Sequence, residues 1–384
     1  MRIVLVSMLN YHFVRWVDQL KDSGHEVFWF DINDNGQKVE KLSWLHQKVG
    51  WKLKSNYSHR YFFKKHFPKL YKIIQKYNER DVKKEFEKYL VEVQPDVVHS
   101  LALYISCVPI IEVMNKFPNI KWIYSSWGSD LYDYQNVPKE LELIKKVLPR
   151  VNYMFSDCYR DYEIAKKYGF QNIFLGVFPG GGGYQLNRLR SAIVHSEHKK
   201  GIAIKGFQGQ WGKAITVLKA LLLIEKTLKD IPIVVFGADQ EVQDFIDKSV
   251  LSNWENICVY GKIQQEEVFG IFAKSHIYIG NSVSDGMPNT MLEAMIMDVF
   301  PIQSNPGGVT QELIENGVNG FLIEDVENEV KIAQILLEAI RDNDFVKNAV
   351  SYNSLNIVPS LEYTTIKKNV LQSYRKVFPA DEIL

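Results

Sequence analysis

The sequence predicts an α/β protein built from two doubly wound, Rossmann-like domains that face each other across a cleft. Short apolar strands alternate with amphipathic helices in the first half, the same alternation begins again after Lys200, and a run of glycines separates the two series. Such alternation is typical of parallel sheets with crossover helices. At 384 residues, the chain has the length expected for two domains of about 150–200 residues each.

The first series opens with a buried strand and not with a signal sequence. Polar residues Asn10 to His12 follow the apolar run, where a signal sequence would carry a small-residue cleavage site. The predicted strands are Ile3–Val6, Glu26–Phe30, Asp96–His99, Trp122–Ser125 and Tyr153–Ser156. The predicted helices include Phe13–Ser23, Asp81–Val93 and Lys139–Val147.

Pro179 and the four glycines that follow it, Gly180–Gly183, interrupt this pattern. Consecutive glycines favour no regular element, so the segment is a hinge, a linker or a loop close to a ligand. We therefore expect an N-terminal domain over residues 1–180, a linker over 181–200 and a second domain over 201–360. Residues 361–384 should form a C-terminal helix that packs back on the first domain.

The second series repeats the alternation up to residue 341. Its predicted strands are Ile202–Lys205, Ile231–Phe236, Ile257–Tyr260, Ile277–Ile279, Phe300–Ile302 and Gly320–Leu322. Its predicted helices are Ala214–Leu228, Gln240–Lys248, Glu266–Lys274, Thr290–Met297, Val309–Glu315 and Glu329–Arg341. Ligands of such folds gather at the carboxyl ends of the strands, here across the cleft between the domains.

Composition favours a globular protein of the cytoplasm. A hydrophobic content of 46% with 24% charged residues is ordinary for a globular protein, and no apolar run reaches the roughly 18–20 residues of a membrane span. The three cysteines lie far apart without metal-ligand spacing, which fits free thiols in a reducing compartment.

The stretch Lys41–Tyr77 stands out by its charge. It contains ten lysines and arginines, no acidic residue, and aromatic residues throughout. This pattern fits peripheral contact with an anionic membrane, such as the inner face of the plasma membrane. It fits equally a solvated helical face whose aromatic side chains pack inward. Nucleic acid is not expected as a partner, because no nucleic-acid-binding motif accompanies the patch.

The segment Ser284–Glu293 is the strongest candidate for a binding site. Gly286 and Pro288 confine a tight loop, and a helix begins after it near Thr290. Unpaired N–H groups at a helix start attract phosphate oxygens. The carboxylate of Glu293 offers two acceptor oxygens to a sugar cis-diol. The alternative is that Glu293 is an exposed helix residue and that Asp285 caps the loop.

A second pair of turns lies downstream. Asn305–Glu312 contains a Gly-Gly turn, and Glu315–Leu322 contains an Asn-Gly turn that leads into a strand. Like Ser284–Glu293, these turns are expected at the end of a strand, and they should lie beside that first loop.

Residues Gly280–Ile323 resemble the signature of family 4 retaining glycosyltransferases, which have the GT-B fold. In that family an acid, seven further residues and a second acid stand in a loop rich in Gly and Pro, before a Gly-Gly and an Asn-Gly turn. The resemblance implies that Glu293 binds the ribose hydroxyls of the donor nucleotide. It also implies that the loop holds the donor sugar and diphosphate through Asp285, Gly286, Met287, Pro288, Asn289 and Thr290. Asp285, as the catalytic first acid, is one methylene shorter than the usual Glu.

The family also has a basic residue that neutralises the diphosphate, and the matching position is Lys213. Gly206 and Gln208 belong to the same segment, where Phe207 replaces the usual Arg, so Lys205 or another cation must supply its charge. Lys262 and Ile263 match the loop that contacts the nucleobase, and Gly237 ends a neighbouring strand.

In the first domain, Ser125–Asp130 resembles the family's His-Gly-x-Asp loop, with Trp127 in place of the common His. Asp130 is therefore a candidate for orienting a substrate hydroxyl. Asn10, His12 and His99 lie near strand ends on the side where the family binds the acceptor, although a loop histidine is more often solvent-facing.

The activity implied is transfer of a sugar, with retained anomeric configuration, from a UDP- or GDP-type nucleotide sugar to an acceptor hydroxyl. A lipid-linked or surface glycan is the expected acceptor, as in polysaccharide biosynthesis, and neither a metal nor another cofactor is expected. Alternatives are a sugar-nucleotide epimerase or phosphorylase of the same fold, or a non-catalytic two-lobed solute-binding protein. A dinucleotide dehydrogenase is disfavoured because no Gly-x-Gly-x-x-Gly follows a strand.

Overall fold

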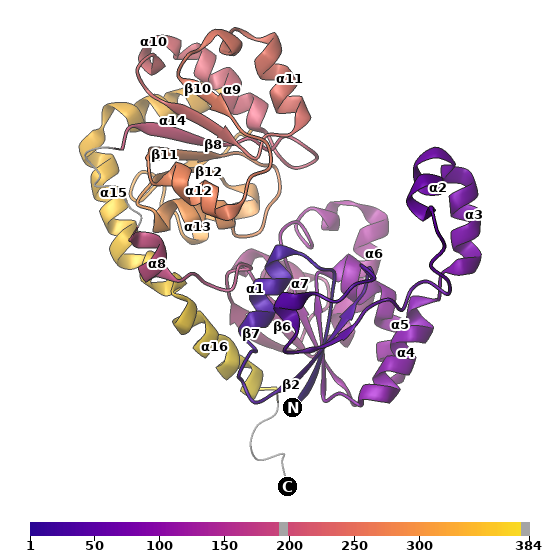
Figure 1. The fold of residues 1–384 in the computed structure, drawn as a ribbon. Helices are drawn as coiled ribbons and strands as arrows, with labels where there is room; N and C mark the ends of the chain where they lie inside the picture. Colours follow the sequence, from indigo (N-terminus) through magenta and orange to yellow (C-terminus); the bar gives the residue numbers. More distant parts are fainter. Residues whose placement is uncertain (192–198, 378–384) are drawn as a thin grey trace. The chain divides into compact units, whose positions relative to one another are not determined.

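The computed structural model describes residues 1–191 and 199–377, and it divides the chain into two compact units, each with a parallel sheet (Figure 1). The first unit contains Met1–Asp157, Asp161–Gly181 and the chain from Asn369 onward. The second unit contains Cys158–Arg160 and Gly182–Lys368. The predicted α/β class with two doubly wound domains is confirmed.

The sheet of the first unit has seven strands in the order β3-β2-β1-β4-β5-β6-β7, all parallel. The strands are β1 (Arg2–Ser7), β2 (Glu26–Asp31), β3 (His46–Lys48), β4 (Val97–Leu101), β5 (Lys121–Ser125), β6 (Tyr153–Ser156) and β7 (Ile173–Val177). Ile3 to Val6 of the central strand β1 are fully buried, as expected for a strand covered on both faces. The edge strands β3, which is short and polar, and β7 were not predicted from the sequence.

The helices of the first unit follow the strands in chain order. They are α1 (Tyr11–Asp18), α2 (Arg60–His66), α3 (Pro68–Asn78), α4 (Val82–Val93), α5 (Ile111–Lys116), α6 (Pro138–Val147) and most of α7 (Tyr159–Lys167). Helix α1 begins two residues before the predicted start, because the Asn10 side chain caps it by accepting from the N–H of Phe13 at 2.7 Å.

The sheet of the second unit has six parallel strands in the order β10-β9-β8-β11-β12-β13. The strands are β8 (Gly201–Lys205), β9 (Ile233–Phe236), β10 (Ile257–Val259), β11 (Ser275–Gly280), β12 (Phe300–Ser304) and β13 (Phe321–Ile323). The helices are α8 (Leu186–Arg190), α9 (Ala214–Leu223), α10 (Glu225–Leu228), α11 (Gln240–Lys248), α12 (Gln265–Phe272), α13 (Asn289–Ile296), α14 (Glu329–Arg341), α15 (Asn343–Asn356) and the first part of α16 (Tyr363–Arg375).

Alternate residues of these strands enter two separate cores. On β8, Ile202 and Ile204 pack with α9, α11 and α14, whereas Ala203 packs with α12 and α13 on the opposite face. The sheet is therefore covered on both faces, and its loops remain as the places where a ligand can bind.

The predicted helix over Val309–Glu315 is wrong. The chain forms two short 3₁₀ turns there, Pro306–Gly308 and Thr310–Glu312. Gly307 and Gly308 adopt φ of +62° and +83°, which favour glycine, and the Asn305 side chain accepts from the N–H groups of Thr310 and Gln311. Local side-chain bonding thus replaces the helical pattern.

The glycine-rich segment is not simply a free linker. The boundary between the units falls between Gly181 and Gly182, and residues 182–191 already belong to the second unit. Tyr184 is buried, its N–H donates to the carbonyl of Leu361 at 2.8 Å, and its own carbonyl accepts from Tyr363 at 2.8 Å. The rest of the predicted linker, residues 192–198, lies outside the described residues.

The C-terminal helix α16 is divided between the units, and its residues from Asn369 onward belong to the first unit. Tyr374 is fully buried, and its hydroxyl lies 2.6 Å from Nδ1 of His99, while Nε2 of His99 lies 2.8 Å from the Ser125 hydroxyl. Burial lowers the pKa of His99 to about 3, so the ring is neutral. The preceding residues of α16, Tyr363–Lys368, belong to the second unit.

We expect Tyr374→Phe to destabilise the first unit by about 1–3 kcal/mol, because it leaves a ring nitrogen of His99 buried without its partner. The loss of stability should appear in calorimetry as a lower melting temperature for the transition of the first unit. Tyr352→Phe, on an exposed part of α15, is the matched control and should leave the melting temperature unchanged.

Candidate active site

The residues that the sequence analysis assigned to donor binding gather at one edge of the second sheet. They follow the carboxyl ends of β8, β9, β10 and β11, and the Gly-Gly turn follows the end of β12. Because all these strands are parallel, their carboxyl ends lie at the same edge. The sheet thus brings together loops that are up to about a hundred residues apart in the sequence, from Gly206 to Pro306.

Helix α13 begins directly after the loop Ser284–Pro288. Pro288 occupies the N-cap, and no side chain caps the helix among the described residues, so its first N–H groups remain available to an anion. The Tyr184 hydroxyl lies 3.4 Å from the Asn289 side-chain oxygen. The loop therefore leads into a helix start with the electrostatic character that a diphosphate requires.

Glu293 lies one turn into α13 and is 8% exposed. Its Oε1 accepts a hydrogen bond from the side-chain amide of Gln265, the first residue of α12. The alternative of an exposed helix residue is therefore wrong for Glu293. Gln265 was not recognised in the sequence, because nothing in its surroundings shows that α12 starts beside α13.

Gly280 ends β11 at a point where no larger residue fits. A Cβ atom there would lie 2.2 Å from Oε1 of Gln303 and 2.3 Å from the Tyr278 hydroxyl. These two buried side chains are hydrogen-bonded to each other at 3.2 Å. Burial raises the pKa of Tyr278, and the charges of Asp285 and Glu293 raise it further, so its hydroxyl stays protonated beneath the loop.

Lys213 stands at the N-cap of α9, beside the positive end of that helix. Its backbone is tied to the loop after β11, since its N–H donates to the carbonyl of Asn281 at 2.9 Å. Its ammonium group forms an ion pair with the carboxylate of Glu327, whose side chain is 62% exposed. The anion that a lysine needs at this end of a helix is supplied by Glu327, which the sequence analysis did not identify.

Lys205 and Asp285 form a second ion pair at this edge, with the ammonium nitrogen 3.6 Å from Oδ2. Phe207, at the position of the family's arginine, is 37% exposed and contributes no charge. The charge of Lys205, which remains a candidate for the substitute cation, is thus partly balanced by Asp285.

The remaining predicted donor residues lie along the same edge. The N–H of Gly206 donates to the carbonyl of Phe236, and the N–H of Gly237 donates to that of Gly261, so three loops are tied together. Gln208 is also held, because its Oε1 accepts from the N–H of Ile215 at 3.0 Å. Lys262 is exposed and Ile263 is half-buried, which leaves this loop open to a ligand.

Arg160 is a residue of this edge that the sequence analysis missed. Its Nη2 donates to the carbonyl of Asp285 at 2.8 Å, and its Nη1 donates to the carbonyl of Pro306 at 2.7 Å. It lies more than a hundred residues before either partner, in a segment with no motif, so only the fold reveals it.

The predicted residues of the first unit have mainly structural contacts. Asn10 caps α1, and His99 is buried in the core with both ring nitrogens bonded, which does not support contact of His99 with an acceptor. The ring centroids of His12, in α1, and Trp127, after β5, lie 6.0 Å apart, so the start of α1 meets the loop after β5. Burial raises the pKa of Asp130 to about 7; its Oδ2 accepts from the Tyr124 hydroxyl and from the N–H of Leu103, each at 2.6 Å.

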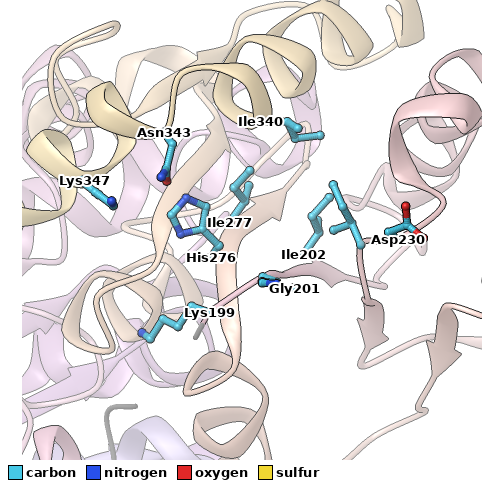
Figure 2. Close-up of a pocket in the computed structure, with 11 residues that line it drawn as sticks. Lys199, Gly201, Ile202, Asp230, His276, Ile277, Ile340, Asn343 and Lys347 are labelled. Carbon is cyan, nitrogen blue, oxygen red and sulfur yellow. The ribbon is translucent and has the colours of Figure 1, made fainter. Parts of the chain in front are cut away.

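The opposite edge of the second sheet carries a pocket of about 420 Å³ (Figure 2). Its lining includes Gly201 at the start of β8 and His276 near the start of β11, together with Lys199 and Lys347. None of the predicted site residues lines this pocket. It is therefore separate from the candidate active site.

Residues 199–354 match the family model described as glycosyl transferases group 1. The match agrees with the family resemblance drawn from Gly280–Ile323, and it includes every donor-site residue assigned in the sequence. The resemblance to glycosyltransferases of the GT-B fold is thus confirmed, and residues 199–354 of the second unit carry it.

Two curated proteins and a solved structure illustrate the similarity. The chain is 27% identical over 173 residues to an uncharacterised glycosyltransferase of Methanocaldococcus jannaschii. It is 23% identical over 233 residues to a Campylobacter jejuni α-1,4-N-acetyl-D-galactosaminyltransferase named for a diphosphoundecaprenol-linked acceptor. These alignments cover 44% and 61% of this chain, and the chain spans about half the length of these relatives, 42% and 56%.

The structure of Anabaena HepE in complex with UDP matches with a TM-score of 0.70 at 11% identity, covering 98% of this chain and 100% of that chain. At 11% identity, this similarity shows that the two proteins share a fold and no more.

We expect Asp130→Asn to change the pH dependence of stability. In the unfolded chain Asp130 loses its proton near its ordinary pKa of 3.8, whereas in the folded chain it keeps the proton up to about pH 7. Wild-type stability should therefore fall as pH rises from 4 to 7, by up to about 1.4 kcal/mol per pH unit from this group, and level off above it. The amide oxygen of Asn can still accept both hydrogen bonds, so Asp130→Asn should lack this decline.

The measurement is the melting temperature of wild type and Asp130→Asn between pH 4 and 8. Asp133→Asn, a neighbouring carboxyl that is less buried, serves as the control and should follow the wild type. Parallel curves for wild type and Asp130→Asn would contradict the raised pKa.

Proposed function

We propose that the chain is a retaining glycosyltransferase that moves a sugar from a UDP- or GDP-type nucleotide sugar to an acceptor hydroxyl, without a metal ion. The observation that carries the proposal is the meeting of three groups at one sheet edge: the buried carboxylate of Glu293, the uncapped start of α13 and the ammonium group of Lys213. The UDP named with the Anabaena neighbour supports a nucleotide diphosphate as the ligand.

In this proposal Glu293 accepts hydrogen bonds from both ribose hydroxyls, and Gln265 holds the carboxylate in place. The helix start and Lys213 stabilise the negative charge that develops on the departing diphosphate. Because Lys213 pairs with the exposed Glu327 in this structure, the diphosphate must compete with that carboxylate. The acceptor proton passes to the leaving phosphate oxygen, so that no separate base is needed.

We expect UDP or GDP at a concentration of about 100 times its dissociation constant to stabilise the protein by about 2.7 kcal/mol, seen as a raised melting temperature. Lys213→Ala should reduce turnover by about 100- to 1000-fold, since it removes a fixed charge that acts on the leaving group. The measurements are a thermal-shift series with nucleotides and an assay of sugar transfer with the nucleotide sugar that binds.

Lys219→Ala, an exposed lysine on the same helix α9, is the matched control and should keep normal turnover. Near-normal turnover of Lys213→Ala would remove Lys213 from the mechanism. Release of free sugar or its epimer from the donor, without an acceptor, would favour the epimerase or phosphorylase alternative.

We further propose a cytoplasmic protein whose acceptor is a lipid-linked or surface glycan at the membrane, as in polysaccharide biosynthesis. The name of the Campylobacter relative, with its diphosphoundecaprenol acceptor, supports a lipid-linked substrate. Among the described residues, no helix combines the length and the apolar character needed to cross a bilayer. Contact with a membrane would therefore be peripheral in this part of the chain.

The basic aromatic stretch Lys41–Tyr77 divides into two parts in the structure. Leu42, Leu45 and Trp51 are buried in the first unit, and the indole N–H of Trp51 donates to the carbonyl of Asp31 at 2.8 Å. In this part, the buried Trp51 supports the alternative in which aromatic side chains pack inward.

Helices α2 and α3 behave differently. They form a hairpin that stands away from the sheet of the first unit (Figure 1), and α2 contains no buried residue. The large apolar side chains that the hairpin exposes are Tyr61, Phe62, Phe67, Leu70, Ile73 and Tyr77. The cations of the two helices are Arg60, Lys64, Lys65, Lys69, Lys72 and Lys76, and no acidic residue accompanies them. Exposed rings beside unbalanced cations favour an anionic lipid surface as the partner of this hairpin.

We expect the protein to sediment with vesicles that contain anionic phosphatidylglycerol and not with vesicles of neutral phosphatidylcholine. Replacing Lys64, Lys65, Lys69 and Lys72 with Gln should weaken binding by several kcal/mol, about 1 kcal/mol per lysine. Replacing Lys145, Lys146, Lys166 and Lys167 on α6 and α7 is the charge-matched control. Equal sedimentation of both variants, or none of the wild type at low salt, would contradict this proposal.

A further inference from the structure

The guanidinium group of Arg160 joins two loops of the candidate active site. One loop, Ser284–Pro288, follows β11, and the other, the Gly-Gly turn, follows the neighbouring strand β12. Arg160 donates to the carbonyl of Asp285 in the first loop at 2.8 Å and to the carbonyl of Pro306 in the second at 2.7 Å. The planar fork of an arginine fixes the spacing of two acceptors, which a lysine cannot do.

These two bonds also set the direction of the N–H groups that follow. In a trans peptide the C=O and the next N–H point in opposite directions, and the described chain contains no cis peptide bond. With the carbonyls of Asp285 and Pro306 turned toward Arg160, the N–H groups of Gly286 and Gly307 point away from it. Neither N–H group donates a hydrogen bond to another of the described residues, and Gly286 is buried.

Arg160 is itself held by Glu312, which follows the Gly-Gly turn. Oε1 of Glu312 accepts from the N–H of Arg160, and Oε2 accepts from the N–H of Tyr159, both at 2.8 Å. These are the first two N–H groups of α7, so the carboxylate also pairs with the positive end of that helix. Glu312 thus fixes the main chain from which the guanidinium extends.

We infer that Arg160, fixed by Glu312, is a positioning residue for donor binding. It holds the peptide planes after Asp285 and Pro306 so that the N–H groups of Gly286 and Gly307 face the diphosphate sugar. The inference rests on the proposed function of this edge as a nucleotide-sugar site. Asp285 is then held twice, through its carbonyl by Arg160 and through its carboxylate by Lys205 at 3.6 Å.

The test uses Arg160→Met, which keeps the length of the side chain and removes the fork. Loss of two hydrogen bonds from a charged donor should speed amide hydrogen exchange in residues 284–289 and 306–309 by about tenfold or more. Affinity for UDP, or for GDP if the wild type prefers it, should fall about tenfold, because the diphosphate loses oriented N–H donors. Affinity for the corresponding monophosphate, which keeps the ribose contact with Glu293, should change less than about twofold.

Arg190→Met is the matched control. Arg190 also belongs to the second unit and donates to a backbone carbonyl, that of Ile296, but at the other end of α13, where it pairs with Asp298 at 3.3 Å. Its loss should lower the melting temperature and leave the ratio of diphosphate to monophosphate affinity unchanged. Arg160→Lys, with a single ammonium group, should give an intermediate ratio, and it replaces Arg160→Met if that variant fails to fold.

Unchanged exchange in the two loops, or an equal loss of diphosphate and monophosphate affinity, would overturn the inference. A wild-type protein that binds neither nucleotide would instead contradict the proposed function. In that case, the exchange rates of the two loops still decide whether Arg160 positions them.

Discussion

The parallel register of β8, β11 and β12 is the constraint on which the candidate active site depends. Ile204 pairs with Ile279, and Gly280 pairs with Gln303, so the three strands end at the same edge of the sheet. Every loop that follows them must then leave the sheet side by side. Close packing at this edge leaves no room for a side chain at Gly280, because Tyr278 and Gln303 already fill the space above the strand. The loop after β11 therefore starts from a rigid base.

The charges at this edge are arranged in pairs. Lys213 faces Glu327, and Lys205 faces Asp285. The partner carboxylates differ in exposure, 62% for the side chain of Glu327 and 27% for that of Asp285. An exposed ion pair contributes little to stability and exchanges readily with another anion, so the Lys213 pair is the easier one for a diphosphate to displace. The pair of Lys205 and Asp285 is better suited to holding the loop than to binding the donor.

The first unit uses its polar residues differently. His99, Ser125 and Tyr374 form a buried chain of hydrogen bonds that joins β4, β5 and α16. Asp130 similarly ties the loop after β5 to that after β4, through Leu103 and Tyr124. Two of the candidate site residues of this unit, His99 and Asp130, are thus buried and hydrogen-bonded. The α2–α3 hairpin, in contrast, exposes large apolar side chains such as Tyr61, Phe62 and Tyr77.

The sequence by itself determined the fold class, the positions of most strands along the chain and the resemblance to glycosyltransferases, because alternating apolar runs and a loop such as Ser284–Glu293 are local signals. It placed the Gly-Gly turn at a strand end, since Gly307 lies three residues after Ser304, and it placed Glu293 on the helix that follows the loop. It failed over Val309–Glu315, where the Asn305 side chain competes with helical hydrogen bonds.

Only the tertiary structure revealed that four further residues contact the candidate site: Gln265, Glu327, Arg160 and Glu312. It also showed that His99 is buried and does not belong to a surface loop. The partners of these side chains are mostly distant in sequence, and their contacts exist only once parallel strands bring separate loops to one edge. The burial of a side chain and its hydrogen-bond partners depend on that arrangement, so they cannot be predicted from the local sequence.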